Sequence, residues 1–133
     1  MISQRLKTIA SMVDTESIID VGCDHAYLDI FLAKTRNIKC TAIDVREGII
    51  NNVRSAIKRE KLEDNIQVIL NDGLEGVKIN NNDTVILSGL GTKTILNIVK
   101  DKKISNLIIQ SNDDQYLLRK ILTKSNYYIV DEK

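Results

Sequence analysis

Aspartates stand at the ends of short apolar segments, where a sheet would present them to a ligand. Asp20 lies in the apolar segment that precedes Gly22, and Asp44 and Asp72 end two later segments. Asp44 follows Gly22 by about twenty residues, the spacing at which a carboxylate can meet a ribose diol beside an α/β sheet. The pattern predicts a site for an adenosine-containing cofactor.

The turn after the first apolar segment limits which cofactor this is. An NAD site favours Gly-x-Gly-x-x-Gly, because a pyrophosphate must approach the helix N-terminus, and a P-loop needs Gly-x-x-x-x-Gly-Lys-Ser/Thr. Here Gly22 is followed by Asp24 and Ala26, and an acid in this turn would repel a pyrophosphate. S-adenosylmethionine carries a sulfonium and an ammonium and no phosphate, so acids around it are favourable. The turn therefore favours S-adenosylmethionine.

Each acid receives an expected role. Asp20 and Asp24 suit the cationic methionine end, Asp44 the ribose hydroxyls and Asp72 the adenine amino group. Structural roles stay open for three of them: Asp20 as a cap of the turn, Asp44 as an ordinary strand-end acid, and Asp72 in an Asx-turn before Gly73. The predicted cofactor-binding residues are Asp20, Gly22, Cys23, Asp24, Asp44, Val45, Asn71, Asp72, Gly73 and Ser88.

Strand-like and helix-like segments alternate along the chain. Strands are expected at 17–21, 39–44, 66–70, 84–87, 107–109 and 127–130. Helices are expected at 2–13, 26–36, 47–60, 92–100 and 113–124. We expect Ser111 or Asn112 to cap the last helix. The alternation predicts an α/β fold in one domain, residues 1–133, with a parallel Rossmann-like sheet and helices on both faces.

Composition excludes several classes of protein. With 19 Lys and Arg against 18 Asp and Glu, the net charge is +1, less basic than is usual for a protein that binds nucleic acid mainly through phosphates. No apolar run approaches the ~20 residues that span a membrane, and the start lacks the apolar core of a signal peptide. Cys23 and Cys40 show neither metal-ligand spacing nor a CxxC pattern. We expect reduced thiols, no metal site and a cytoplasmic location.

Four segments resemble, in order, motifs of the bacterial TrmK family of class I S-adenosylmethionine-dependent methyltransferases. Residues 20–28 (DVGCDHAYL) resemble the first motif, and 71–74 (NDGL) the exit of the third strand. Residues 88–92 (SGLGT) are similar to an Ala-Gly-Met-Gly-Gly loop, and 109–112 (IQSN) to a Leu-Gln-Pro-Asn loop. The opening Arg5-Leu6, followed by Ile9-Ala10, also fits.

The resemblance implies a function. Members of this family methylate N1 of adenine-22 in tRNA, so S-adenosylmethionine is the expected cofactor and tRNA the expected substrate. Three positions depart from the family pattern: Leu90 replaces Met, Thr92 replaces Gly, and Ser111 replaces Pro. None of these changes removes a charged group.

The family continues past the point where this chain stops. In relatives a hairpin completes the sheet, and its last strand inserts antiparallel between strands five and six. We expect this last antiparallel strand to be missing here, which leaves strand edges unpaired. The family's C-terminal helical domain, thought to help grip tRNA, is also expected to be absent, so the chain is either truncated or completed by a partner.

The loop after the fourth strand is the expected substrate end. Methyl transfer needs alignment of nucleophile, methyl and leaving sulfur, and a target base must first leave its stack. We place the base against the small residues 88–91, with Gln110 and Asn112 as polar readers and Asp24 nearest the reacting centre. The predicted catalytic residues are Asp24, His25, Ser88, Gly89 and Asn112.

Two aromatic residues and two other functions stay open. His25 is either a general base or a helix-start residue bonded to a neighbour. Tyr27 either stacks on the target base or packs between helix and sheet, and we favour packing. The alternative functions are a methyltransferase acting on a small molecule or another RNA, and a cofactor-binding module without activity.

Overall fold

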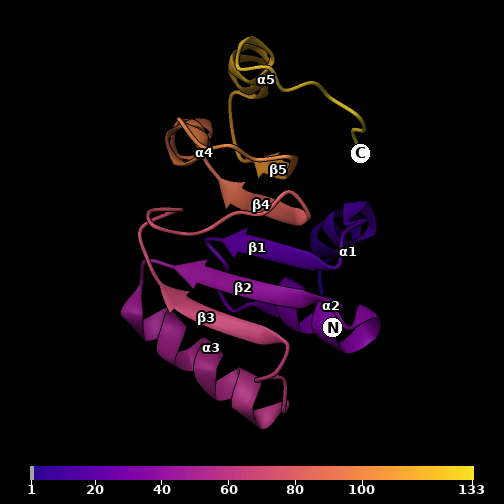
Figure 1. The fold of residues 1–133 in the computed structure, drawn as a ribbon, viewed down its shortest axis with the longest axis vertical. Helices are drawn as coiled ribbons and strands as arrows, with labels where there is room; N and C mark the ends of the chain where they lie inside the picture. Colours follow the sequence, from indigo (N-terminus) through magenta and orange to yellow (C-terminus); the bar gives the residue numbers. More distant parts are fainter. Residues whose placement is uncertain (1) are drawn as a thin grey trace.

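The computed structural model describes residues 2–133, and Met1 lies outside this description. Within the described residues, five parallel strands form one sheet in the order β3-β2-β1-β4-β5 (Figure 1). The strands are β1 Ser17–Val21, β2 Lys39–Asp44, β3 Ile66–Leu70, β4 Asp83–Leu90 and β5 Asn106–Ser111. The order confirms the predicted Rossmann-like α/β sheet. It also places a topological switch point between β1 and β4, where ligands bind in such sheets.

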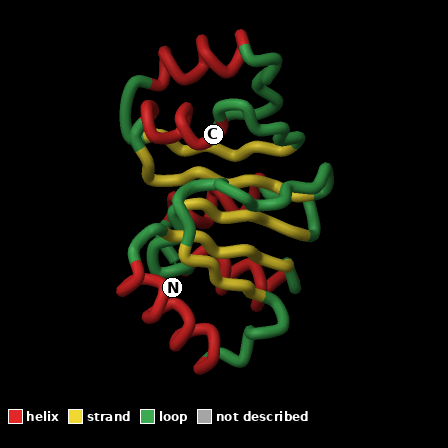
Figure 2. The backbone as a smooth tube through the Cα atoms, turned by 60° about the vertical axis from the view of Figure 1, so that its left-hand side comes forward, coloured by secondary structure: helices red, strands yellow, loops and turns green. Residues whose placement is uncertain are grey.

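Helices cover both faces of the sheet, as predicted (Figure 2). They are α1 Gln4–Met12, α2 Tyr27–Arg36, α3 Glu47–Arg59, α4 Thr92–Val99 and α5 Gln115–Lys124. The first three pack their apolar stripes on one face, and α4 and α5 pack on the other. None of the helices in the described part has the length and apolar character that crossing a bilayer requires.

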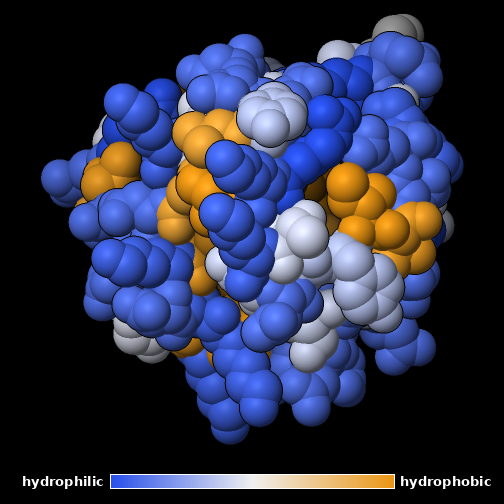
Figure 3. All heavy atoms as spheres, turned by 90° about the horizontal axis from the view of Figure 1, so that it is seen from above, coloured by the Kyte–Doolittle hydropathy of each residue, from blue (hydrophilic) through white to orange (hydrophobic). Residues whose placement is uncertain are grey.

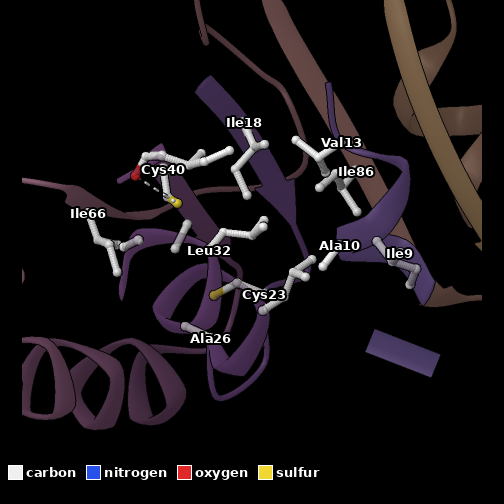
Figure 4. Close-up of a cluster of buried hydrophobic side chains, with 14 of the residues drawn as sticks. Ile9, Ala10, Val13, Ile18, Cys23, Ala26, Leu32, Cys40, Ile66 and Ile86 are labelled. Carbon is white, nitrogen blue, oxygen red and sulfur yellow. Dashed lines mark hydrogen bonds between the residues drawn. The ribbon is translucent and has the colours of Figure 1, made fainter. Parts of the chain in front are cut away.

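The face beneath α1, α2 and α3 holds the larger buried cluster (Figure 4). Leu32 of α2 is fully buried, and Ile18 of β1 and Ile86 of β4 belong to the same cluster. Burying such a side chain is worth roughly 1.5–3 kcal/mol relative to leaving it exposed. This packing fixes α2 against β1, and so it also fixes the turn that joins them.

The opposite face is covered in part by a segment without a helix. This segment, residues 71–82, leaves the carboxyl end of β3 and reaches the amino end of β4, so it must cross the sheet (Figure 1). Leu74 is buried on this face, and Val77 and Ile79 pack beside it. The crossing places β4 beside β1, on the side of β1 away from β2.

The strand predicted at 127–130 is wrong. This segment forms no strand in the described part of the chain, and the side chains of Tyr128 and Val130 are 84% and 89% exposed. Aromatic and β-branched residues favour a strand only where a neighbouring strand supplies hydrogen bonds. Here the segment follows α5 without joining β5. Figure 3 shows this end of the molecule, where apolar side chains gather in patches among hydrophilic ones.

The predicted cap of the last helix is also wrong. Asp114, and neither Ser111 nor Asn112, accepts the hydrogen bond from the backbone N–H of Leu117, at 3.2 Å. The hydroxyl of Ser111 is used one turn earlier, where it accepts from the backbone N–H of Asp113 and pairs with Thr92. The loop therefore bends once more before the helix begins.

Candidate active site

A cleft of about 870 Å³ opens at the carboxyl ends of the strands, at the switch point. It is lined by β1, β2, β3 and β4 exits and by the start of α1. Both predicted sets of residues contribute to it in full. They are Asp20, Gly22, Cys23, Asp24, His25, Asp44, Val45, Asn71, Asp72, Gly73, Ser88, Gly89 and Asn112.

The turn after β1 has a backbone that only certain residues adopt. Gly22 has a φ of +75°, and its N–H and that of Cys23 both donate to the carbonyl of Ile43, at 2.8 and 2.9 Å. A Cβ on Gly22 would also lie 3.4 Å from the Leu90 side chain. Asp24 is left-handed as well, with a φ of +52°. This turn therefore folds tightly over β2 and leaves its edge open to a ligand.

Asp44 is a buried carboxylate held by several donors. The backbone N–H of Asp24 donates to Oδ2 and that of Arg46 to Oδ1, both at 3.1 Å. Arg46 adds a two-pronged side-chain contact, Nε to Oδ1 at 2.9 Å and Nη2 to Oδ2 at 3.0 Å. Burial opposes the charge on Asp44, but the hydrogen bonds from Arg46 and Asp24 outweigh it and lower its pKa. Asp44 is therefore ionised at neutral pH.

Arg46 was not predicted as a site residue. It stands two positions after Asp44, at the N-cap of α3, and its Nη2 also reaches Oδ1 of Asp24 at 3.4 Å. The sequence signal was its short distance from the predicted ribose acid. It shares the carboxylate that a ribose diol would use, so the cofactor end contains a competing cation.

Asp20 faces a second buried acid, Asp29 of α2. Asp20 is 4% exposed and Asp29 is fully buried. Burial raises the pKa of both, and the negative charge of Asp20 raises that of Asp29 further. Neither carboxyl oxygen of Asp29 has a hydrogen-bond partner among the described residues. Because burial raises the pKa of both carboxyl groups, and repulsion raises that of Asp29 further, the fold favours a pair that carries a proton over two carboxylates.

The pairing also bears on the capping role left open for Asp20. Within residues 2–133, no backbone N–H donates to its carboxylate, so Asp20 does not cap the turn in that way. Asp29 was missed by sequence reasoning, although an acid inside the apolar stretch Leu28–Ile30 was a visible signal.

The two cysteines are free thiols, and Cys23 lines the cleft. Burial, followed by the negative charges of Asp29 and Asp20, raises the pKa of both thiols. Neither thiol is therefore activated as a nucleophile. The part of the chain that the structure describes also contains no cluster of three His, Cys, Asp or Glu side chains that could hold a metal ion.

At the end of β3, the Asn71 side chain is hydrogen-bonded within its own turn, whereas that of Asp72 is not. The Asn71 side chain donates to the carbonyls of Gly73 and Glu75, at 3.1 and 2.9 Å, and thereby holds the turn. Asp72 is exposed, and its carboxylate accepts no hydrogen bond from any described residue. The Asx-turn alternative is therefore not seen, and Asp72 is one of the residues that line the cleft.

At the substrate end, polar groups bond to one another. The Gln110 Oε1 accepts from Gly89 N and from Arg5 Nη1, both at 2.8 Å, and its Nε2 donates to Asn112 Oδ1 at 3.3 Å. Asn112 Nδ2 donates to Gly89 O at 2.9 Å. Gln110 is not among the residues that line the cleft, and its role as a polar reader of the base stays a prediction. Its amide is occupied in holding the loop.

His25 and Tyr27 lie beside each other at the cleft. Their ring centroids are 5.6 Å apart, and His25 Nε2 is 3.8 Å from Asp24 Oδ1. Tyr27 is 57% exposed, so the prediction that it packs between helix and sheet is wrong. It is the first residue of α2, and the buried face of that helix begins one residue later, at Leu28.

Comparison with known proteins identifies the family. A family model described as "Methyltransferase domain" matches residues 2–133. The chain belongs to this methyltransferase family. Solved structures of two relatives have the same fold. TrmK from M. capricolum with S-adenosyl-homocysteine is 35% identical, with a TM-score of 0.91, over 100% of this chain and 62% of that one. Streptococcus pneumoniae Sp1610 with S-adenosyl-L-methionine is 32% identical, with a TM-score of 0.90, over 98% and 65%.

A curated relative has a named activity. The tRNA (adenine(22)-N(1))-methyltransferase of Bacillus subtilis is 29% identical to this methyltransferase-family chain over 98% of the chain and 58% of the relative. The chain spans between 58% and 62% of the length of the curated relatives it matches.

Proposed function

We propose that this chain is an S-adenosylmethionine-dependent methyltransferase domain that acts on N1 of an adenine in tRNA, in the cytoplasm. The observation that carries the proposal is the acid-rimmed cleft at the switch point of a methyltransferase-family fold. Four aspartates and two arginines line it: Asp20, Asp24, Asp44, Asp72, Arg5 and Arg46.

The residues present fit this cofactor better than a dinucleotide. The tight turn at Gly22 lets a ligand approach the backbone, and the ionised Asp44 suits a ribose diol. Asp72 has an unused carboxylate for the adenine amino group. Asp24 would oppose a diphosphate at this turn but favours a cationic methionine end.

The chain's own part in the reaction is alignment and charge stabilisation. S-adenosylmethionine supplies a methyl group on a cationic sulfur. Ser88 and Gly89 border the substrate end, where the bulge in β4 between Ser88 and Leu90 turns small residues toward the cleft. N1 of neutral adenine has a lone pair, and methylation leaves the base positively charged. We expect the exposed carboxylate of Asp24, which lines the cleft, to stabilise that charge.

The test combines binding and transfer. Titration calorimetry should show binding of S-adenosylmethionine and S-adenosylhomocysteine and none of NAD or ATP. Incubation with tRNA transcripts should yield 1-methyladenosine by nucleoside mass spectrometry, and a transcript with guanine in place of adenine-22 should yield none. Binding of NAD or ATP in the cleft would overturn the proposal. Cofactor binding without transfer to any tRNA would overturn the activity and favour a binding module.

A further inference from the structure

Two buried hydroxyl groups join the loops that follow β4 and β5. Thr92, the first residue of α4, is 1% exposed, and Ser111, the last residue of β5, is 5% exposed. Their oxygens, Oγ1 and Oγ, are 2.7 Å apart. Both also lie 2.6 Å from the carbonyl oxygen of Asp113. Because each hydroxyl has one proton, one hydroxyl donates to the other, and the second donates to this carbonyl.

Backbone donors complete the connection between the two loops. The N–H of Thr92 donates to Oδ1 of Asp113 at 2.8 Å, and the N–H of Asp113 donates to Ser111 Oγ at 3.2 Å. A Cβ on Gly91 would lie 3.4 Å from Oδ2 of Asp113, so a glycine here leaves room for this carboxylate. A residue of the β5 loop thus satisfies a free N–H at the start of α4.

The strand ladder alone does not fix the end of β4. Its pairing with β5 is regular up to Ser88 and Gln110. The register then shifts at a bulge and resumes with one last pair, Leu90 and Ser111. A bulge disrupts the ladder locally, and Gly89 lies inside this one with a φ of +73°. The hydroxyl pair begins at the last paired residue of β5, so it takes over where the ladder ends.

Two cleft residues, Gly89 and Asn112, depend on this connection. Asn112 lies between Ser111 and Asp113, both of which bond to the hydroxyl pair. Its backbone N–H donates to the carbonyl of Leu90 at 2.8 Å, and its Nδ2 donates to the carbonyl of Gly89 at 2.9 Å. A shift of Ser111 or Asp113 would therefore move Asn112 and stretch both of these bonds.

We propose that Thr92 and Ser111 are positioning residues for methyl transfer, an inference that deepens and rests on the proposed function. Neither residue lines the cleft, so they act through Asn112 and Gly89, which do. Misplacing a reacting group by about 1 Å can slow a reaction roughly a hundredfold. Loss of the pair should therefore slow transfer to tRNA. Affinity for the cofactor should persist, because Asp44 has its own donors on the other side of the cleft.

The experiment compares two buried hydroxyl pairs at opposite ends of the same sheet. The second pair is Thr15 and Thr84, with 2.6 Å between the Oγ1 atoms, and Thr84 lies at the amino end of β4. Thr92→Val and Thr84→Val each replace one buried hydroxyl by a methyl group, so both should lower the urea midpoint. Only Thr92→Val should lower kcat with tRNA, by about fivefold or more. Neither should change the Kd of S-adenosylmethionine in calorimetry.

Further variants and an exchange measurement separate positioning from general stability. Thr92→Ser keeps the hydroxyl and should keep most of the activity. Ser111→Ala should lower kcat as Thr92→Val does, and the double variant should be no slower than either, because both remove one shared connection. In hydrogen exchange followed by NMR, the backbone N–H of Asn112 should exchange faster in Thr92→Val than in Thr84→Val.

The contrary results are distinct. Equal kcat values in Thr92→Val and Thr84→Val would leave the first pair a structural role only and overturn the inference. A matching loss of affinity for S-adenosylmethionine would overturn it as well, by assigning the effect to the cofactor end. If circular dichroism shows Thr92→Val to be unfolded, Ser111→Ala decides the same question.

Failure of the unsubstituted protein to methylate any tRNA would overturn the proposed function. The exchange rate of the Asn112 N–H then still tests whether the hydroxyl pair holds the substrate end. Equal rates in Thr92→Val and Thr84→Val would overturn the inference by itself.

Discussion

The cofactor end and the substrate end of the cleft hold their polar side chains in place by different sets of hydrogen bonds. At the cofactor end, Asp44 keeps its charge because two backbone N–H groups and Arg46 donate to it. At the substrate end, Gln110 and Asn112 bond to the β4 loop and to each other. The first arrangement leaves charges facing the cleft, whereas the second leaves few free donors or acceptors.

The difference implies that side chains at the cofactor end bind the ligand, whereas the amides at the substrate end support the loop. A ligand at the cofactor end meets the carboxylate of Asp44, whose backbone donors come from the two adjoining turns. A base at the substrate end meets backbone and small side chains, since the amides behind them are occupied. We infer that substitutions at the cofactor end chiefly change ligand affinity, and that substitutions in the amide network chiefly change stability.

Asp44→Ala should have the largest effect on cofactor binding. It removes an ionised acceptor, and a lost charge-assisted hydrogen bond is worth roughly 1–3 kcal/mol. The measurement is calorimetry with S-adenosylhomocysteine at neutral pH. Asp14→Ala removes an exposed acid outside the cleft lining and serves as the control. Unchanged affinity in Asp44→Ala would remove Asp44 from the cofactor site.

Asp24→Asn should reduce turnover more than affinity. Asparagine tolerates the φ of +52° at this position, so the substitution removes the charge and preserves the turn. Loss of stabilisation of a cationic methylated base should lower kcat about tenfold or more, with a smaller change in the Kd of S-adenosylmethionine. Equal losses in kcat and Kd would instead assign Asp24 to cofactor binding alone.

The sequence predicts the elements that local patterns determine, but not those that depend on distant neighbours. The bounds of β1, β2 and β3 agree with the predicted segments, because each is an apolar run between polar turns. The fourth strand was predicted to end before Ser88, yet β4 continues to Leu90, since pairing with β5 extends a strand over polar residues. Whether a segment becomes a strand depends on a neighbouring strand to pair with, and the local sequence does not show that neighbour. This pairing explains both the longer β4 and the absence of a strand at 127–130 in the described chain.

The site shows the same limit at the level of side chains. The acids at strand ends were predictable because strand, turn and helix adjoin in sequence. The contact of Arg5 with Gln110 joins residues 105 positions apart, and that of Asp20 with Asp29 depends on how α2 packs on β1. Residue type and spacing could suggest that Gln110 was polar and near the site, but not that its amide was already bonded.

Gln110→Leu tests the scaffolding role of the substrate end. It leaves the N–H of Gly89 without its acceptor, which should lower the free energy of unfolding by about 1–2 kcal/mol. Gln110→Glu keeps the acceptor and should recover most of the loss. Gln67→Leu, at an exposed position on β3, is the matched control in urea unfolding. Wild-type stability in Gln110→Leu would show that the amide network does not hold the loop.

Asp29→Asn should stabilise the protein, by about 1 kcal/mol at neutral pH, because the amide can donate to Asp20 without needing a proton. The pKa of Asp29 is raised on folding, so the unfolded chain releases this proton at lower pH than the folded one. The stability due to the protonated pair is therefore present in acid and is lost as pH rises above the ordinary carboxyl pKa. Urea unfolding at pH 5 and 7.5 should give a larger gain at pH 7.5. If Asp29→Asn lowered the free energy of unfolding at both pH values, the buried carboxyl group of Asp29 would not be destabilising.

Arg46→Met should give the smallest change in affinity for S-adenosylhomocysteine, and the direction of this change is informative. The guanidinium contacts both oxygens of Asp44, which the ribose hydroxyls must share or take over. Its removal should tighten binding of S-adenosylhomocysteine a fewfold at pH 7.5. Without the Arg46 side chain the pKa of Asp44 should rise, because only backbone donors then oppose the effect of burial. Asp44 would then become protonated, and tight binding would be lost, at a higher pH than in the unsubstituted protein. Arg54→Met, an exposed cation on the same helix, is the control. Weaker binding at pH 7.5 would instead make Arg46 part of the cofactor site, and the cofactor end would then be as fully bonded as the substrate end.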